Sequence, residues 1–162
     1  MAILETSFND YLKGMKKMDI QKIEYDSEKY QQTLNLRNKV MRVPLGLTID
    51  EEDFSHEAEQ YILGAFDDEF LLGVGVLSQK LDESKMKVEY LCVDSQRQSA
   101  GVGKQLLSHL ELYAKKEHAK TIELEARVSA QSFYEKMGYV AYGDTYLMAI
   151  APVEHIRMEK FL

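Results

Sequence analysis

The fold is decided by residues 89–104, which read Glu-Tyr-Leu-Cys-Val-Asp-Ser-Gln-Arg-Gln-Ser-Ala-Gly-Val-Gly-Lys. The apolar run 88–93, with its aromatic and β-branched residues, predicts a buried strand. A polar segment follows, and Gly101 and Gly103 then open a long amphipathic helix. The first turn of a helix has unpaired N–H groups and a partial positive charge, and glycines let a large anion approach the main chain. We therefore predict that a phosphate-bearing ligand binds at this helix N-terminus.

Three known anion-binding patterns contain such glycines, and their spacing separates them. A P-loop needs a Gly five residues before its Gly-Lys pair and a Ser or Thr after it, where this chain has Gln98 and Gln105. The dinucleotide fingerprint needs a third Gly three residues after Gly103, where Leu106 stands. The third pattern, Gln/Arg-x-x-Gly-x-Gly/Ala, fits residues 98–103 throughout. At this point the chain resembles the GNAT superfamily of acetyl-CoA-dependent N-acyltransferases, whose pyrophosphate-binding loop has this form.

A second stretch carries the same resemblance. Residues 129–139, Ser-Ala-Gln-Ser-Phe-Tyr-Glu-Lys-Met-Gly-Tyr, are similar to the GNAT motif in which a short helix ends in Phe-Tyr-Glu-Lys-x-Gly-Phe/Tyr. Together with their flanking elements the two motifs cover residues 86–142. The resemblance implies an α/β fold (α+β mixed), with a central mixed, mostly antiparallel twisted sheet. It also implies a V-shaped splay between two parallel central strands, and about four flanking helices.

The hydrophobic pattern predicts the remaining elements. A helix from residue 102 to about 116 would cross between the strand at 88–93 and a strand over 121–128, where apolar and charged residues alternate. Such a crossover implies a parallel pair of strands with a right-handed connection. We expect further strands near 20–23, 61–66, 70–77, 139–142, 146–151 and from 156, and further helices over 27–42, from 50 and over 129–137.

Length and composition restrict the number of domains, the class of partner and the compartment. The 162 residues suit one domain, which we place at 19–162, with 1–18 as an extension compatible with an amphipathic helix. A net charge of −7 argues against nucleic acid as a partner and is compatible with a cationic amine. No apolar run is long enough for a membrane span, and Cys92 is the only cysteine, so we expect a cytoplasmic protein. The histidines lack partners at ligand spacing, so we expect no metal site.

The resemblance also implies how acetyl-CoA would bind as co-substrate. Pantetheine would pair with the main chain of Leu91 and Val93, like an added strand. An N–H near Leu91 or Cys92 would face the thioester oxygen. The loop 98–104 would hold the pyrophosphate. The cofactor-binding residues implied are therefore Leu91, Cys92, Val93, Gln98, Ser99, Ala100, Gly101, Val102, Gly103, Lys104, Ser129 and Ser132.

Two residues are candidates for proton transfer. Tyr134 would protonate the departing thiolate, if Phe133 takes the core and leaves the tyrosine free; the alternative is a core aromatic. Glu89 would act as general base for the incoming ammonium, directly or through a water chain; the alternative is a solvent-facing strand residue. His155 would be the base only if the last strand lines the acceptor cleft. Cys92 is expected to be a buried small hydrophobe.

The sequence thus predicts an N-acetyltransferase that transfers the acetyl group directly to a primary amine of a small molecule or a peptide. The alternative is a CoA- or acyl-CoA-binding sensor of the same fold without turnover, which would be expected to have lost the acid at Tyr134. A homodimer is compatible with the sequence, and the identity of the acceptor is left open.

Overall fold

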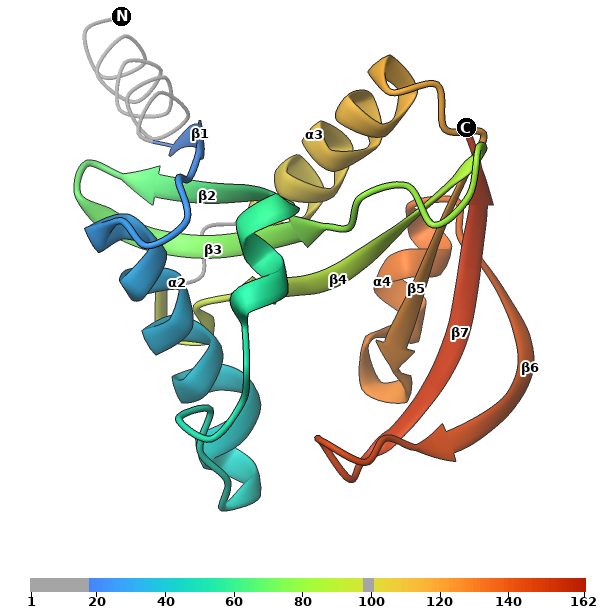
Figure 1. The fold of residues 1–162 in the computed structure, drawn as a ribbon. Helices are drawn as coiled ribbons and strands as arrows, with labels where there is room; N and C mark the ends of the chain where they lie inside the picture. Colours follow the sequence, from blue (N-terminus) through green and yellow to red (C-terminus); the bar gives the residue numbers. More distant parts are fainter. Residues whose placement is uncertain (1–17, 98–100) are drawn as a thin grey trace, which may run out of the picture.

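A seven-stranded sheet organises the computed structural model, which describes residues 18–97 and 101–162 (Figure 1). The strand order is β1-β2-β3-β4-β5-β7-β6. The strands are β1 (Met18–Lys22), β2 (Tyr61–Asp67), β3 (Phe70–Leu77), β4 (Lys85–Val93), β5 (Thr121–Arg127), β6 (Val140–Leu147) and β7 (Glu154–Phe161). The helices are α2 (Glu28–Arg37), continued by a π-helical turn (Asn38–Arg42), α3 (Val102–Lys116) and α4 (Gln131–Lys136).

The two central strands run parallel and then separate. Only the first halves of β4 and β5 are paired, from Lys85↔Thr121 to Val88↔Leu124. Beyond Val88, β4 stays paired with β3, as far as Gly73↔Val93, while β5 stays paired with β7. All other neighbouring strands in the sheet are antiparallel. The predicted mixed sheet and its V-shaped splay are therefore confirmed, and Figure 1 shows β4 and β5 diverging.

A β-bulge lies at the point of divergence. Val76 of β3 is opposite Tyr90, and the next residue, Leu77, is opposite Val88, so Glu89 is the extra residue of β4. The bulge places Val88 and Tyr90 on opposite faces of the sheet, since they pack in different core clusters. A regular strand would have placed both on one face.

Helices cover both faces of the sheet. α3 packs on one face, where an added Cβ at Gly73 or Gly75 would lie 2.9 Å from side chains of α3 such as Leu106 or Leu110. α2 packs on the other face, and Figure 1 shows α2 and α3 on opposite sides of β2 and β3. The Ser27 side chain caps α2 by accepting a hydrogen bond from the Tyr30 N–H (3.1 Å).

Two predicted elements differ in the structure. The acidic run 50–53 lies in a turn, and the helix that follows is a 3₁₀ segment, Ser55–Glu59, so residues 18–97 and 101–162 hold three α-helices. The strands expected at 139–142 and 146–151 are one strand, β6, with a register shift between Tyr142 and Tyr146. Pattern alone cannot separate a shifted strand from two short ones.

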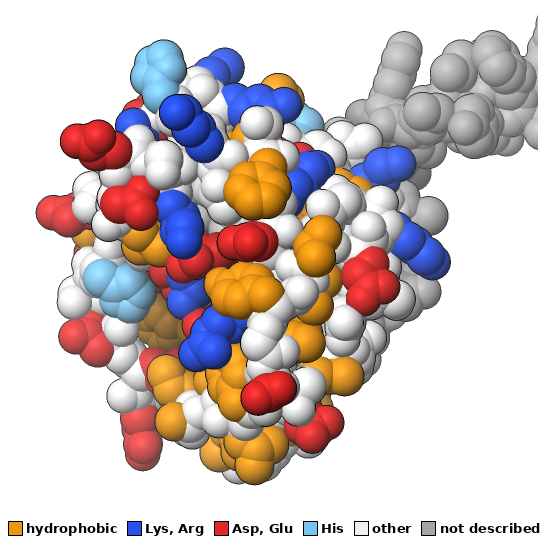
Figure 2. Space-filling model, turned by 90° about the vertical axis from the view of Figure 1, so that its right-hand side faces the viewer, with side chains coloured by type: hydrophobic (Ala, Val, Ile, Leu, Met, Phe, Trp, Pro, Cys, Tyr) orange, Lys and Arg blue, Asp and Glu red, His pale blue; other side chains and the backbone are white. Residues whose placement is uncertain are grey.

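The outer face of β6 and β7 is exposed. Figure 2 shows this side of the molecule, where hydrophobic side chains lie among acidic and basic ones. Among the exposed large hydrophobic residues are Val140, Tyr142, Leu147 and Phe161 on the two strands, and Ile150 on the loop that joins them.

Candidate active site

A slot of about 100 Å³ lies where β4 and β5 separate. The bulge residue Glu89 lines it from β4, and Tyr134 lines it from α4. Two residues that the sequence places 45 positions apart are thus brought together by the splay. The full lining is Met41, Val88, Glu89, Tyr90, Leu91, Leu124, Glu125, Arg127, Ala130, Tyr134 and His155.

Beyond Val88, the main-chain groups of β4 on the slot side are not paired with β5 in the described part of the chain. The N–H of Asp94 donates to the carbonyl oxygen of Leu72 in β3 (2.8 Å). Because hydrogen-bonded and non-hydrogen-bonded residues alternate along an antiparallel pair, Cys92 is also directed to β3. The main-chain groups of Leu91 and Val93 are then directed away from β3, toward β5. Of the two N–H groups expected near the thioester, that of Leu91 is the one directed to the slot.

The N-terminus of α3 lies beyond the far end of β4. Gly101 is the N-cap, with φ of +95°, and the Gln105 N–H donates to its carbonyl oxygen (2.9 Å). The N–H groups of Val102, Gly103 and Lys104 precede that first bond and have no partner within the helix. An added Cβ at Gly103 would lie 3.3 Å from Phe133 and 3.6 Å from Val93. The helix start therefore adjoins the end of β4, whereas residues Gln98, Ser99 and Ala100 lie outside the described residues.

Tyr134 is more buried than its neighbour on α4. It is 8% exposed and belongs to the core cluster on the α3 face, while Phe133 is partly buried and lies near Gly103. Tyr134 is thus buried more deeply than Phe133, the reverse of the expected order, although Phe133 packs against the core and Tyr134 lines the slot as expected. Burial raises the pKa of the Tyr134 hydroxyl to about 12, so the hydroxyl keeps its proton at neutral pH.

Glu89 has the electrostatics of a proton acceptor. Its side chain is 26% exposed, and burial raises the pKa of its carboxyl above the ordinary value. The Lys87 ammonium lies 3.8 Å away and opposes this shift, but Lys87 also pairs more closely, at 2.7 Å, with Glu125. Glu125 in turn accepts a hydrogen bond from the Tyr146 hydroxyl. Glu89 is thus the less tightly held of the two carboxylates next to Lys87.

A larger cavity of about 520 Å³ adjoins the slot. The two share Met41, Val88, Glu89, Tyr90 and three further residues, so one leads into the other. The walls are contributed by the turn after α2, by β4 and β5, and by the β6–β7 loop. The full lining is Met41, Arg42, Glu51, Glu52, Asp53, Phe54, His56, Lys87, Val88, Glu89, Tyr90, Glu125, Arg127, Met148, Ile150, Ala151 and His155.

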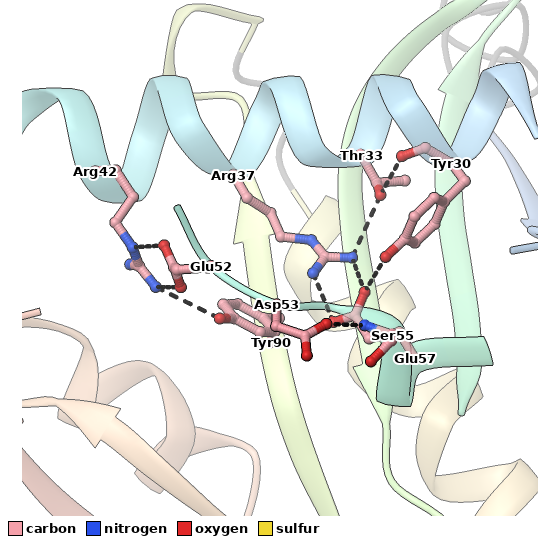
Figure 3. Close-up of polar contacts among 9 residues, drawn as sticks. All are labelled: Tyr30, Thr33, Arg37, Arg42, Glu52, Asp53, Ser55, Glu57 and Tyr90. Carbon is pink, nitrogen blue, oxygen red and sulfur yellow. Dashed lines mark hydrogen bonds and ion pairs between the residues drawn. The ribbon is translucent and has the colours of Figure 1, made fainter. Parts of the chain in front are cut away.

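Polar contacts hold one wall of this cavity in place (Figure 3). The Arg42 guanidinium, at the end of the π-helical turn, donates twice to Glu52, from Nε (2.8 Å) and from Nη2 (3.0 Å). The same Nη2 lies 3.4 Å from the Tyr90 hydroxyl. Farther along α2, Arg37 pairs with Glu57 of the 3₁₀ segment. The segment between α2 and β2 is therefore fixed to α2 at two points.

His155 lies inside β7 and is 4% exposed. Its Nδ1 lies 2.7 Å from the Val153 carbonyl oxygen, which can only accept, so Nδ1 carries a proton. In the neutral ring Nε2 is then the proton-accepting nitrogen. Since His155 lines both cavities, the last strand does line the cleft, which is the condition under which the sequence keeps His155 as a candidate base.

Other predicted residues lie outside the two cavities. The side chain of Cys92 packs against α2, and burial raises the pKa of its thiol to about 12. The expectation of a buried small hydrophobe is confirmed. Ser129, Ser132 and Lys104 are exposed and do not line the slot.

Sequence reasoning missed several residues of the site, because long-range packing brings them in. Met41 and Arg42 follow α2, and Met148 and Ile150 lie on the β6–β7 loop. Arg127 alternates outward on β5, and in sequence it has the pattern of an ordinary solvent-facing strand residue. The splay exposes it to the slot instead.

Two searches over the described part of the chain bear on the class of protein. None of the helices there is long and apolar enough to span a bilayer. In the same residues, no group of three or more His, Cys, Asp or Glu side chains is placed to hold a metal ion.

Comparison with known proteins agrees with this architecture. Residues 43–162 match the model of the acetyltransferase (GNAT) domain. The chain is 30% identical over 122 residues to YjcF, an uncharacterized N-acetyltransferase of Bacillus subtilis strain 168, covering 75% of this chain and 82% of that protein.

Solved structures show the same fold at low sequence identity. An aminoglycoside 6'-N-acetyltransferase complexed with coenzyme A superposes with a TM-score of 0.71 at 19% identity, covering 88% of this chain and 96% of the other. Arabidopsis thaliana Naa50, in complex with a bisubstrate analogue of CoA and an acetylated peptide, gives a TM-score of 0.68 at 18% identity, covering 90% and 99%. The sequence matches and the splayed sheet lead to one conclusion: the chain belongs to the GNAT family of acetyltransferases, which are acyltransferase enzymes.

Proposed function

We propose that the protein transfers the acetyl group of acetyl-CoA directly to a primary amine of a small molecule or a peptide. The observation that carries this proposal is the continuity of the two cavities, since a slot with free β4 main-chain groups leads into a wider cavity lined by carboxylates. The structural neighbours solved with coenzyme A and with a peptide bisubstrate analogue support both halves of the proposal.

Acetyl-CoA would bind along the free side of β4. The amides of pantetheine would pair with the main chain of Leu91 and Val93, as in strand addition. The pyrophosphate would bind at the start of α3, where the N–H groups of residues 102–104 are unpaired and the helix dipole favours an anion. The exposed Ser129 and Ser132 and the loop 98–100 would complete the contacts of the nucleotide end. The thioester would then lie in the slot next to Tyr134.

The residues of the slot supply the proton transfers that amide formation needs. An ammonium entering the cavity loses a proton to Glu89, and the free amine attacks the carbonyl carbon of the thioester. The N–H of Leu91 donates to the developing oxyanion. As the tetrahedral species collapses, the C–S bond breaks and Tyr134 gives its proton to the departing thiolate. The attacking nitrogen loses its second proton, which restores the Tyr134 hydroxyl, and Glu89 releases the first proton to solvent. The products are the N-acetylated amine and free CoA thiol, with one net proton released.

Thermal unfolding with acetyl-CoA, CoA, ATP and NAD tests the binding half. Acetyl-CoA and CoA should raise the midpoint, and saturation at about 100 times the dissociation constant adds roughly 2.7 kcal/mol to the free energy of unfolding. ATP and NAD should have no comparable effect. Absence of a shift with the CoA compounds would overturn the proposal.

Thiol release in the presence of mixed amines tests the catalytic half. We expect Tyr134→Phe to keep the thermal shift with CoA and to lose about 10²–10⁴-fold in kcat. Tyr139→Phe is the matched control, because the Tyr139 hydroxyl is also buried but donates to Glu111 (3.0 Å), away from the slot. A CoA shift without turnover on any amine would favour the non-catalytic binding protein, and unchanged turnover in Tyr134→Phe would remove its role as acid.

A further inference from the structure

The cavity of about 520 Å³, here called the acceptor cavity, is lined by three basic side chains that differ in how their charges are paired. Arg42 is held by two hydrogen bonds to Glu52, and its side chain is 4% exposed. Lys87 is paired with Glu125 at 2.7 Å. Arg127 forms no ion pair with any of the residues 18–97 and 101–162. The cavity therefore contains one guanidinium whose charge is not balanced by a described carboxylate.

The contacts of Arg127 leave part of the guanidinium unsatisfied. Its Nη2 donates to the carbonyl oxygen of Met41 (2.9 Å). This hydrogen bond joins the end of β5 to the π-helical turn after α2. Its Nε is buried and has no hydrogen-bond partner in the described structure. Burial and the nearby Arg42 charge lower the pKa of Arg127, but a guanidinium keeps its charge under all ordinary conditions. A buried donor without a partner costs free energy, so the hydrogen-bonding capacity of this guanidinium is only partly used within the described residues.

Carboxylates gather on other parts of the same cavity. Glu89 lies at the entrance to the slot, and Asp53 accepts the N–H of Ser55 (2.9 Å), a hydrogen bond that lowers the pKa of its carboxyl. Glu51 also lines the cavity, and it makes no ion pair within the described part of the chain. A ligand of this cavity thus meets groups that favour a cation and one group that favours an anion.

Apart from His56 and His155, the remaining lining is aromatic or aliphatic. Phe54 and Tyr90 stand on one wall with ring centroids 6.3 Å apart, and Met148 and Ile150 contribute from the β6–β7 loop. The volume of about 520 Å³ leaves room for an apolar body between the charged groups.

We propose that Arg127 binds a carboxylate of the acceptor, and that the acceptor is an amino-acid-type compound, with an amine and a carboxylate on an apolar body. This deepens the function proposed above and rests on it. Two N–H groups of one guanidinium match the two oxygens of a carboxylate, which a lysine at this position would not reproduce. The hydrogen bond to Met41 directs the guanidinium toward the wall of the acceptor cavity that the π-helical turn after α2 forms, and not toward β4.

The test uses matched triads of acceptors that differ only in the carboxyl group. One triad is phenylalanine, phenylalaninamide and phenethylamine, and others are built in the same way on leucine and methionine. The wild type should have its highest kcat/KM on the amino acid of a triad. Arg127→Gln should lower kcat/KM on the amino acids by about 10–100-fold, mainly through KM, and leave the amides and the simple amines nearly unchanged. Arg127→Lys should recover part of the loss.

Arg157→Gln is the matched control variant. Arg157 also lies on this side of the sheet, but it is exposed, stacks over Tyr146 at 4.8 Å and lines neither cavity, so its replacement should not change any triad. The thermal shift with CoA, measured in every variant, reports on the cofactor site separately.

The outcomes separate the two proposals. An equal loss of kcat on all three members of a triad would place Arg127 at the reacting thioester and overturn the inference. A wild type that prefers the simple amine throughout would also overturn it, while the N-acetyltransferase function would stand. Absence of both the CoA shift and turnover would instead overturn the function on which the inference rests.

Discussion

Arg37 and Glu57 form a bidentate ion pair in the interior, with Nη1–Oε2 at 2.7 Å, Nη2–Oε1 at 3.0 Å and both side chains fully buried (Figure 3). The Tyr30 hydroxyl donates to Oε1 at 2.8 Å, and the guanidinium lies over the Tyr90 ring at 4.7 Å. The pair joins α2 to the 3₁₀ segment that precedes β2. It therefore fixes the wall of the acceptor cavity from behind.

Removing one charge of this pair should destabilise the protein strongly. Glu57→Gln leaves the Arg37 charge buried and uncompensated, so we expect a loss of about 3–5 kcal/mol in the free energy of unfolding. Urea denaturation of the wild type and the variant measures this loss. Glu123→Gln is the control, because Glu123 pairs with Lys85 at 3.4 Å near the surface, where such a pair contributes at most about 1 kcal/mol. Similar small losses in both variants would contradict the assigned role.

The conformation of Gly101 predicts an effect on CoA binding that steric crowding does not explain. Its φ of +95° strains any residue with a Cβ, although an added Cβ would meet no atom within 4 Å. We expect Gly101→Ala to cost about 1–2 kcal/mol of stability and to weaken CoA binding, because the first turn of α3 shifts. Gly143→Ala, with φ of +74° and equally open surroundings, should lose stability without losing affinity for CoA. Isothermal titration of CoA measures the difference, and equal affinities in the two variants would contradict it.

Cys92 should be chemically inert in the native protein. It is 3% exposed, and burial raises the pKa of its thiol to about 12, so almost no thiolate exists at neutral pH. A disulfide reagent should label no cysteine in the folded state and one after denaturation, since the chain has a single cysteine. Cys92→Ala should keep turnover within a few-fold, as direct transfer requires. Rapid labelling, or a loss of activity without loss of stability, would contradict direct transfer and favour a route through an acetylated Cys92.

The parallel strand pair and its crossover helix could be predicted because strand, glycine loop and helix start are local signals that the sequence carries in order. The order of β2 and β3 followed in the same way from two apolar runs around a turn. The splay followed from the resemblance of the two motifs to the GNAT superfamily. The fold could therefore be predicted well in the half of the chain that holds the motifs.

The acceptor side could not be predicted, because its contacts join distant residues. Where a helix was expected from residue 50, the chain forms a turn and a 3₁₀ segment, which the pairs Arg42–Glu52 and Arg37–Glu57 fix to α2 and its π-helical turn. The bulge at Glu89 leaves no mark in the alternation of residues around it. In sequence Arg127 is an ordinary polar residue of an alternating strand. It lines the slot because β4 diverges from β5 before this position.

Glu89 links the stability of the protein and its activity to pH. Burial raises the pKa of the folded carboxyl, so its contribution favours folding below the ordinary Glu value of about 4.3 and is lost as pH rises through the folded pKa. Glu89→Gln should therefore raise the unfolding midpoint at pH 7, with a gain that shrinks toward pH 4. The same variant should lower kcat by about 10²–10⁴-fold and remove the acidic limb of the kcat/KM profile. Glu123→Gln should keep that limb; if Glu89→Gln keeps it too, the base is another group, and His155, which lines the same slot, is the next to replace.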